Sequence, residues 1–199
     1  MPKKPNDIQV EKLVDAAARV IREDGVAAAT TRRIAADANV PLGTLHYYFA
    51  NKQELFEGVS DRVGASGKEW VTSQVSEGMG VADAAGAIAR AFAHWAASTP
   101  SDQLIEFELG IWALRTRTQF KLPQQSYEEW LSVYRDLLEK SYLPQEKRKD
   151  IDAIARALVA IVDGFIIQDQ FLRAATLPAS ADRIIASVVQ AIQNGVFDL

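Results

Sequence analysis

One short segment near the N-terminus carries side chains suited to binding nucleic acid. Tyr47, Tyr48 and Lys52 carry a hydroxyl or an ammonium group that can hydrogen-bond a DNA phosphate, whatever the base sequence. Gly43 and Thr44 are small enough to let a helix approach base edges. The segment, residues 30–52, predicts DNA contacts by Thr30, Thr31, Arg32, Leu42, Gly43, Thr44, His46, Tyr47, Tyr48 and Lys52.

Some of these side chains can have more than one role. Arg32 can hold a phosphate, read a guanine through its two-pronged guanidinium, or be a solvated surface charge. His46 either touches a base or lies exposed. Tyr47 and Tyr48 can also be core aromatics, which is the role we assign to Phe49; for Tyr47 we favour the DNA contact.

Two short helices and a tight turn must position these side chains. Thr30 predicts an N-cap for a helix over residues 30–38, because a threonine oxygen can accept from the free N–H groups of the first turn. Asn39 tolerates the left-handed backbone that such a turn requires. Pro41 suits the first position of a second helix over residues 42–49. The pattern is that of a helix-turn-helix.

The same segment matches a specific family pattern. The matching positions are Thr31, Ile34-Ala35, Ala38, Asn39-Val40, Gly43-Thr44-Leu45-His46-Tyr47-Tyr48-Phe49 and Lys52-Gln53-Glu54-Leu55. They resemble the DNA-binding signature of the tetracycline-repressor (TetR) family of bacterial regulators. Asn39 stands where glycine is usual, and His46 stands where tyrosine is more common, which bears on the base preference.

The resemblance implies an architecture and a mode of action. It implies a homodimer on a palindromic operator of double-stranded DNA, with three N-terminal helices and a connecting fourth. A helical C-terminal domain would dimerise and bind a small-molecule effector. Regulators of this type are mostly repressors that the effector releases from DNA, so we expect a repressor and not an enzyme.

The composition narrows the remaining possibilities. The 199 residues include 48% hydrophobic ones, enough for a real core, and the net charge of −4 argues against a nonspecific nucleic-acid coat. Without cysteine, and with only His46 and His94 as histidines, no metal site or cofactor is expected. Neither a signal peptide nor a membrane span is visible, so a cytoplasmic protein is expected.

Apolar residues recur at helical spacing along the whole chain, which predicts an all-α fold. The helices are expected at about 8–24, 30–38, 42–49, 51–75, 81–98, 102–117, 123–142, 145–175 and 181–193. The short N-terminal helices predict a helix-turn-helix DNA-binding domain over residues 1–52. Residues 53–199 would then form the helical effector-binding and dimerisation domain, reached through the connecting helix.

The C-terminal domain offers candidates for a pocket and an interface. Clustered aromatic residues can wall an apolar pocket, although each of them can equally be ordinary core. The pocket candidates are Phe92, Trp95, Phe107, Glu108, Trp112, Trp130, Tyr134 and Phe165. The apolar stripes of the last two helices suit a dimeric bundle. The interface candidates are Leu158, Ile161, Val162, Ile185, Val188, Val189 and Ile192.

Three alternatives remain beside the repressor. The first is a DNA-binding structural or division-control protein of the same fold without an effector. The second is an activator. The third is a helical enzyme using Glu106, Glu108 and His94 as acid and base groups, although no nucleophile–base pair or cofactor motif supports it.

Overall fold

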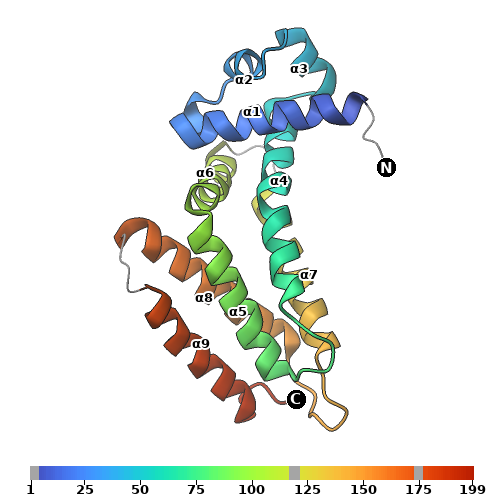
Figure 1. Cartoon of the computed structure of the whole chain (residues 1–199), viewed down its shortest axis with the longest axis vertical. Coiled ribbons are helices and arrows are strands. Elements are labelled where there is room, and N and C mark those ends of the chain that lie inside the picture. Colours follow the sequence, from blue (N-terminus) through green and yellow to red (C-terminus); the bar gives the residue numbers. More distant parts are fainter. Residues whose placement is uncertain (1–4, 117–121, 173–176) are drawn as a thin grey trace. The chain divides into compact units, whose positions relative to one another are not determined.

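The computed structural model describes residues 5–116, 122–172 and 177–199, and in these ranges all regular secondary structure is α-helical (Figure 1). The helices are α1 Pro5–Ala28, α2 Thr31–Asp37, α3 Leu42–Tyr48, α4 Lys52–Ser73, α5 Val81–Ser98, α6 Pro100–Thr116, α7 Leu122–Lys140, α8 Ile151–Leu172 and α9 Leu177–Gln193. The all-α prediction is confirmed. Among the described residues, no helix combines the length and apolar character that a bilayer span needs.

The chain forms two compact units. Residues 1–65 and 101–126 make the first, and residues 66–100 and 127–199 make the second. The expected domain boundary after residue 52 coincides with the start of α4, whereas the contact pattern divides that helix after residue 65. The division of the chain into two separate domains after residue 52 stays a prediction.

The first unit is built around α1. Figure 1 shows α2 and α3 side by side against it. The core is mostly aliphatic, and Leu13, Ile34 and Leu45 are fully buried in it. The chain supplies part of this core from much further along, because Ile105 and Leu109 of α6 belong to the same cluster of buried residues.

Several helix boundaries differ from the prediction; α9, for example, begins at Leu177 and not near residue 181. α1 passes Gly25, where it was expected to end, but the glycine is not helical: its φ of 79° and ψ of 167° kink the chain before Ala28. α8 begins at Ile151 and not at Gln145, so the predicted start was wrong. The reason is local, because the Asp150 carboxylate accepts the N–H of Ala153 at 3.0 Å and caps the helix there.

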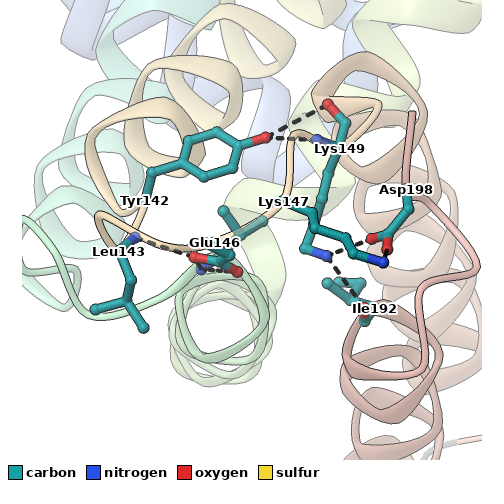
Figure 2. A network of polar contacts seen from close by, with 8 residues as sticks. Tyr142, Leu143, Glu146, Lys147, Lys149, Ile192 and Asp198 are labelled. Atoms are coloured by element: carbon teal, nitrogen blue, oxygen red, sulfur yellow. Dashed lines mark hydrogen bonds and ion pairs between the residues drawn. The ribbon is translucent and has the colours of Figure 1, made fainter.

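In the second unit, α5 packs against both α8 and α9 (Figure 1). A polar network ties the C-terminus to this bundle, as Figure 2 shows. The buried Lys149 ammonium lies 2.7 Å from Asp198 Oδ1 and 3.4 Å from the carbonyl of Ile192. The Tyr142 hydroxyl accepts the N–H of Lys149 at 2.8 Å. The network therefore holds the segment before α8 and the chain end after α9 together.

Candidate functional site

The first helix of the predicted helix-turn-helix starts as its sequence requires. Thr30 has an extended backbone, and its Oγ1 accepts the N–H of Arg33 at 3.2 Å, which confirms the predicted cap. Ile34 and Ala35 face inward and are buried. Thr30 and Arg32 are exposed and Thr31 is half-buried, so two of these three predicted contacts lie fully on the surface.

The turn has the geometry predicted from Asn39. Its φ is 51°, and among the described residues it is the one non-glycine residue with a positive φ. The N–H of Val40 donates to the carbonyl of Ala35 at 2.9 Å, which closes the turn. Pro41 is the N-cap of α3 and not its first helical residue.

α3 presents a divided surface. Leu45 and Phe49 are buried, which confirms the core role predicted for Phe49. On the other side Gly43 and His46 are exposed, and Tyr47 is 77% exposed. A Cβ built on Gly43 meets no atom within 4 Å, so another macromolecule can approach the backbone there. Figure 1 places α3 next to α2 at the end of the first unit where the turn lies.

The other α3 residues predicted to contact DNA are less exposed. Leu42 and Tyr48 are half-buried and pack against the core of the first unit, and Thr44 is half-buried. The rings of Tyr47 and Tyr48 meet edge to face at 5.0 Å between centroids. Tyr48 thus has a packing role besides its predicted phosphate contact, and Tyr47 is the more accessible donor.

The two neighbouring arginines of α2 differ in their surroundings. Arg33 forms an ion pair with Asp24 of α1. Arg32 has no ion pair with any residue that the structure describes, and its guanidinium is exposed. Sequence alone could not separate the two, because the difference depends on which one faces α1.

Lys52, predicted to grip phosphate, lies in an unexpected setting. Its Nζ is 3.4 Å from the carbonyl oxygen of Val26, 4.7 Å from the ring centroid of Phe56 and 5.4 Å from that of Trp112. Burial lowers the pKa of Lys52. The ammonium is therefore held by the protein as well as being a predicted phosphate donor.

The start of α4 carries a capping box in a shifted form. Asn51 Oδ1 accepts the N–H of Glu54 at 2.9 Å. The Glu54 carboxylate reaches back to the N–H of Ala50 at 2.7 Å, one residue before the cap. These two bonds fix the chain between α3 and α4.

A residue pair that sequence reasoning missed joins α6 to the kink in α1. Glu108 Oε2 accepts the N–H of Val26 at 2.8 Å. The kink at Gly25 has room for this carboxylate, since a Cβ on Gly25 would lie 3.1 Å from Oε2. Trp112, one turn further along α6, packs edge to face on Phe56 at 5.1 Å. No sequence signal pairs positions this far apart.

The predicted pocket residues are divided between the two units. Phe107, Glu108 and Trp112 belong to the first unit. In the second unit, Phe92 lies 5.2 Å from Trp95 and 4.7 Å from Trp130, measured between ring centroids. The aromatic cluster, which we define as Phe92, Trp95, Trp130 and Tyr134, ends at Tyr134, 5.9 Å from Trp130.

A groove in the second unit includes the remaining pocket candidate, Phe165. It has a volume of about 270 Å³ and lies between α5, α8 and α9. Alanines with Phe165, Ile166 and Ile185 line its apolar part, while Arg90 and Asp169 are among its charged residues. This volume is just below the range of roughly 300–1,000 Å³ that is usual for ligand pockets.

The predicted interface residues are mostly not on the surface. Leu158, Val162, Ile185 and Ile192 are buried inside the single chain, whereas Ile161, Val188 and Val189 are half-buried. The exposed apolar side chains of α8 and α9 are others: Ile167, Phe171, Leu172 and Ile184, with Phe171 84% exposed. The assignment of the seven residues to a dimer interface stays a prediction.

The described residues contain no cluster of three or more His, Cys, Asp or Glu side chains able to hold a metal ion.

Residues 13–59 match the family model described as "Bacterial regulatory proteins, tetR family". The chain is 34% identical over 166 residues to the HTH-type nicotine-responsive transcriptional repressor HdnoR of Paenarthrobacter nicotinovorans. That match covers 79% of this chain and 81% of HdnoR.

Solved structures share the fold over nearly the whole chain. The multidrug binding protein EbrR, crystallised with imidazole, has a TM-score of 0.69 at 26% identity, covering 94% of this chain and 96% of its own. A TetR-family protein from Streptomyces coelicolor A3 has a TM-score of 0.72 at 26% identity, covering 90% and 97%. Other EbrR structures contain ethidium or proflavin.

Proposed function

Because this chain belongs to the TetR family of bacterial transcriptional regulators, we propose that it is a repressor that binds a palindromic operator as a homodimer and leaves it when a small molecule binds. The observation that carries the DNA-binding part is the exposed side of α3, with Gly43 open and Tyr47 extending from it. Such a surface fits a major groove, where small residues let the helix approach base edges.

Within this interface we assign two roles. Gly43, Thr44 and His46 are the candidates for base contact, together with Arg32 of α2. Tyr47 is the main phosphate donor, and Tyr48 and Lys52 have the same proposed role in addition to their packing contacts. The net charge of −4 favours recognition by shape and hydrogen bonds over a general attraction to DNA.

The response to a small molecule is supported by the relatives. HdnoR is nicotine-responsive by name, and EbrR has been crystallised with imidazole, ethidium and proflavin. In this chain the aromatic cluster and the groove of the second unit supply apolar walls with a few polar groups, the composition typical of ligand sites. A metabolite panel tests which compounds release the DNA.

Homodimerisation is supported by the exposed apolar side chains of α8 and α9. Phe171 and Leu172 are 84% and 66% exposed, and Ile167 lies one turn before Phe171 on α8. Large apolar residues grouped on adjacent helices mark interaction surfaces when they have no partner within the chain. A two-fold symmetric dimer would place two recognition helices on a palindromic site.

The direct test is fluorescence anisotropy on labelled DNA from upstream of the gene, measured at several salt concentrations. We expect Tyr47→Ala and Arg32→Ala each to weaken binding about tenfold. Arg33→Ala is the matched control, because its guanidinium pairs with Asp24; it should stay within about threefold of the wild type. Unchanged affinity in both Tyr47→Ala and Arg32→Ala would refute the proposed interface.

A further inference from the structure

Lys52, the first residue of α4, is a cation that the protein holds without neutralising it. Its Nζ lies 3.4 Å from the carbonyl oxygen of Val26 and over the rings of Phe56 and Trp112, 4.7 and 5.4 Å from their centroids. We call these three uncharged partners the lysine cage. Lys52 forms no ion pair with any residue that the structure describes, although Glu108 accepts the N–H of Val26 nearby. The positive charge of Lys52 is therefore left uncompensated there.

The lysine cage is built by three helices of the first unit. Val26 lies in the last turn of α1, Phe56 in α4 and Trp112 in α6. Phe56 is fully buried, and its ring meets that of Trp112 edge to face at 5.1 Å. Glu108, one turn before Trp112 on α6, fixes Val26 through a hydrogen bond of 2.8 Å. Because each partner is packed or hydrogen-bonded within this unit, the position of the cage is set when the unit folds.

Lys68, further along the same helix, shows the opposite arrangement. Its Nζ lies 5.8 Å from the ring centroid of Trp130, but the carboxylate of Glu129 pairs with it. An ammonium that already has a carboxylate partner gains little from a phosphate, whereas one held by rings and a carbonyl keeps its charge for an incoming anion. The two lysines therefore share an aromatic neighbour and differ in their counter-ion.

The cage holds the Lys52 ammonium in a state that favours an anionic partner. Burial lowers the pKa of Lys52, because the charged form loses part of its hydration. The side chain is half-buried and not enclosed, so a second molecule can reach it. An ammonium has three N–H donors, and the Val26 carbonyl needs only one of them. A lysine side chain that is already held also loses less conformational entropy when it binds.

We infer that the lysine cage positions the Lys52 ammonium for a DNA phosphate, which makes Trp112 of α6 a positioning residue of the DNA interface. The inference rests on the proposed function, because it concerns a contact within that interface. Residues 13–59 match the family model, and α6 lies outside them. The phosphate contact thus depends on a helix beyond the helix-turn-helix and its neighbours.

The first test compares Lys52→Met with Lys68→Met in the full-length protein. Anisotropy is measured on the labelled upstream DNA and on a random-sequence duplex over a range of salt concentrations. Lys52→Met should weaken binding to both DNAs by the same factor, about fivefold, and lower the salt slope by about 0.9, the value for one phosphate. Lys68→Met should match the wild type, because Glu129 already pairs with that lysine. An unchanged salt slope in Lys52→Met would overturn the inference.

A double-mutant cycle then tests the role of Trp112. Trp112→Leu should reproduce the loss of affinity and the lower salt slope, and it should have little further effect in the Lys52→Met protein. Trp112→Phe keeps a ring beside Phe56 and should lose less, so it serves as a second variant if leucine impairs folding. Equal losses from a Trp112 substitution with and without Lys52 would show that the ring acts on the fold alone, and would overturn the positioning role.

The wild-type protein separates this inference from the proposed function. A wild type that binds neither DNA contradicts the proposed function and, with it, the phosphate contact. A wild type that binds the upstream DNA while Lys52→Met and Trp112→Leu bind it equally well contradicts this inference alone. Loss of affinity in both variants, without an additive loss in the double variant, supports both proposals.

Discussion

At the scale of single residues, neighbours of the same type have different roles because they face different surroundings. Arg32 and Arg33 are adjacent, yet only Arg33 has Asp24 as a partner among the described residues. Tyr47 and Tyr48 touch each other, yet Tyr48 packs on the core and Tyr47 extends into solvent. Arg32 and Tyr47 are therefore the more accessible of each pair for the proposed DNA contact.

A substitution at Gly43 should affect protein stability and DNA binding in different ways. Gly43→Leu adds a side chain into open space and replaces a poor helix former, so we expect the unfolding free energy to stay equal or rise by about 0.5 kcal/mol. Operator affinity should fall at least tenfold, because the backbone can no longer approach the bases. Urea denaturation and anisotropy measure the two effects. Unchanged operator affinity would show that α3 does not approach DNA through this position.

Asp198 provides a pH-dependent prediction. The ion pair and hydrogen bond with Lys149 hold the pKa of this carboxyl below its ordinary value. A lowered pKa contributes stability above the unfolded-state pKa, and that contribution is lost as the pH falls through the folded-state pKa. Asp198→Asn should therefore be less stable than wild type at neutral pH, and the difference should shrink below about pH 4. Urea titrations across pH measure it; a constant difference would contradict the assignment.

At the scale of elements, α6 is the feature that ties the DNA-binding helices to the middle of the chain. Ile105 and Leu109 fill the core of the first unit, and Glu108 bonds the backbone at the α1 kink. Asp102 adds an ion pair to Arg22 at 2.5 Å. Any displacement of α6 would therefore act on α1 through buried contacts and a charge-assisted hydrogen bond.

Glu108→Gln tests this connection. An amide oxygen can still accept the Val26 N–H, but the bond loses its charge, so we expect a loss of about 1 kcal/mol in unfolding free energy. Gly25→Ala should cost more, because its φ of 79° is unfavourable for alanine and its Cβ would crowd Glu108 Oε2. Thermal unfolding ranks the two variants. Wild-type stability in both would contradict the role of this contact.

At the scale of the whole molecule, the proposed assembly depends on apolar surface that one chain leaves exposed. α8 and α9 contribute Leu158 and Ile185 to the interior of the second unit, whereas Phe171 and Leu172 of α8 are exposed. In the proposed dimer these helices would stabilise the protomer with one side and contact the second copy with the other.

Phe171→Glu tests the dimer. A carboxylate in place of an 84% exposed phenyl ring should leave the protomer stable, because the ring has few contacts within the chain. It should shift the sedimentation coefficient from dimer to monomer and weaken operator binding at least tenfold, since two half-sites are no longer bound together. Asp136→Asn, exposed on α7, is the control. A Phe171→Glu protein that stays dimeric would place the interface elsewhere.

The sequence by itself determined the helix-turn-helix and the family. Thr30 and Asn39 act on the backbone within a few residues, so their roles could be read from spacing alone. The tertiary structure decided which side of each apolar stripe is buried, because the partner of a helix face depends on the path of the chain. It shows which apolar side chains of α8 and α9 the single chain leaves exposed, and it places Glu108 against Val26.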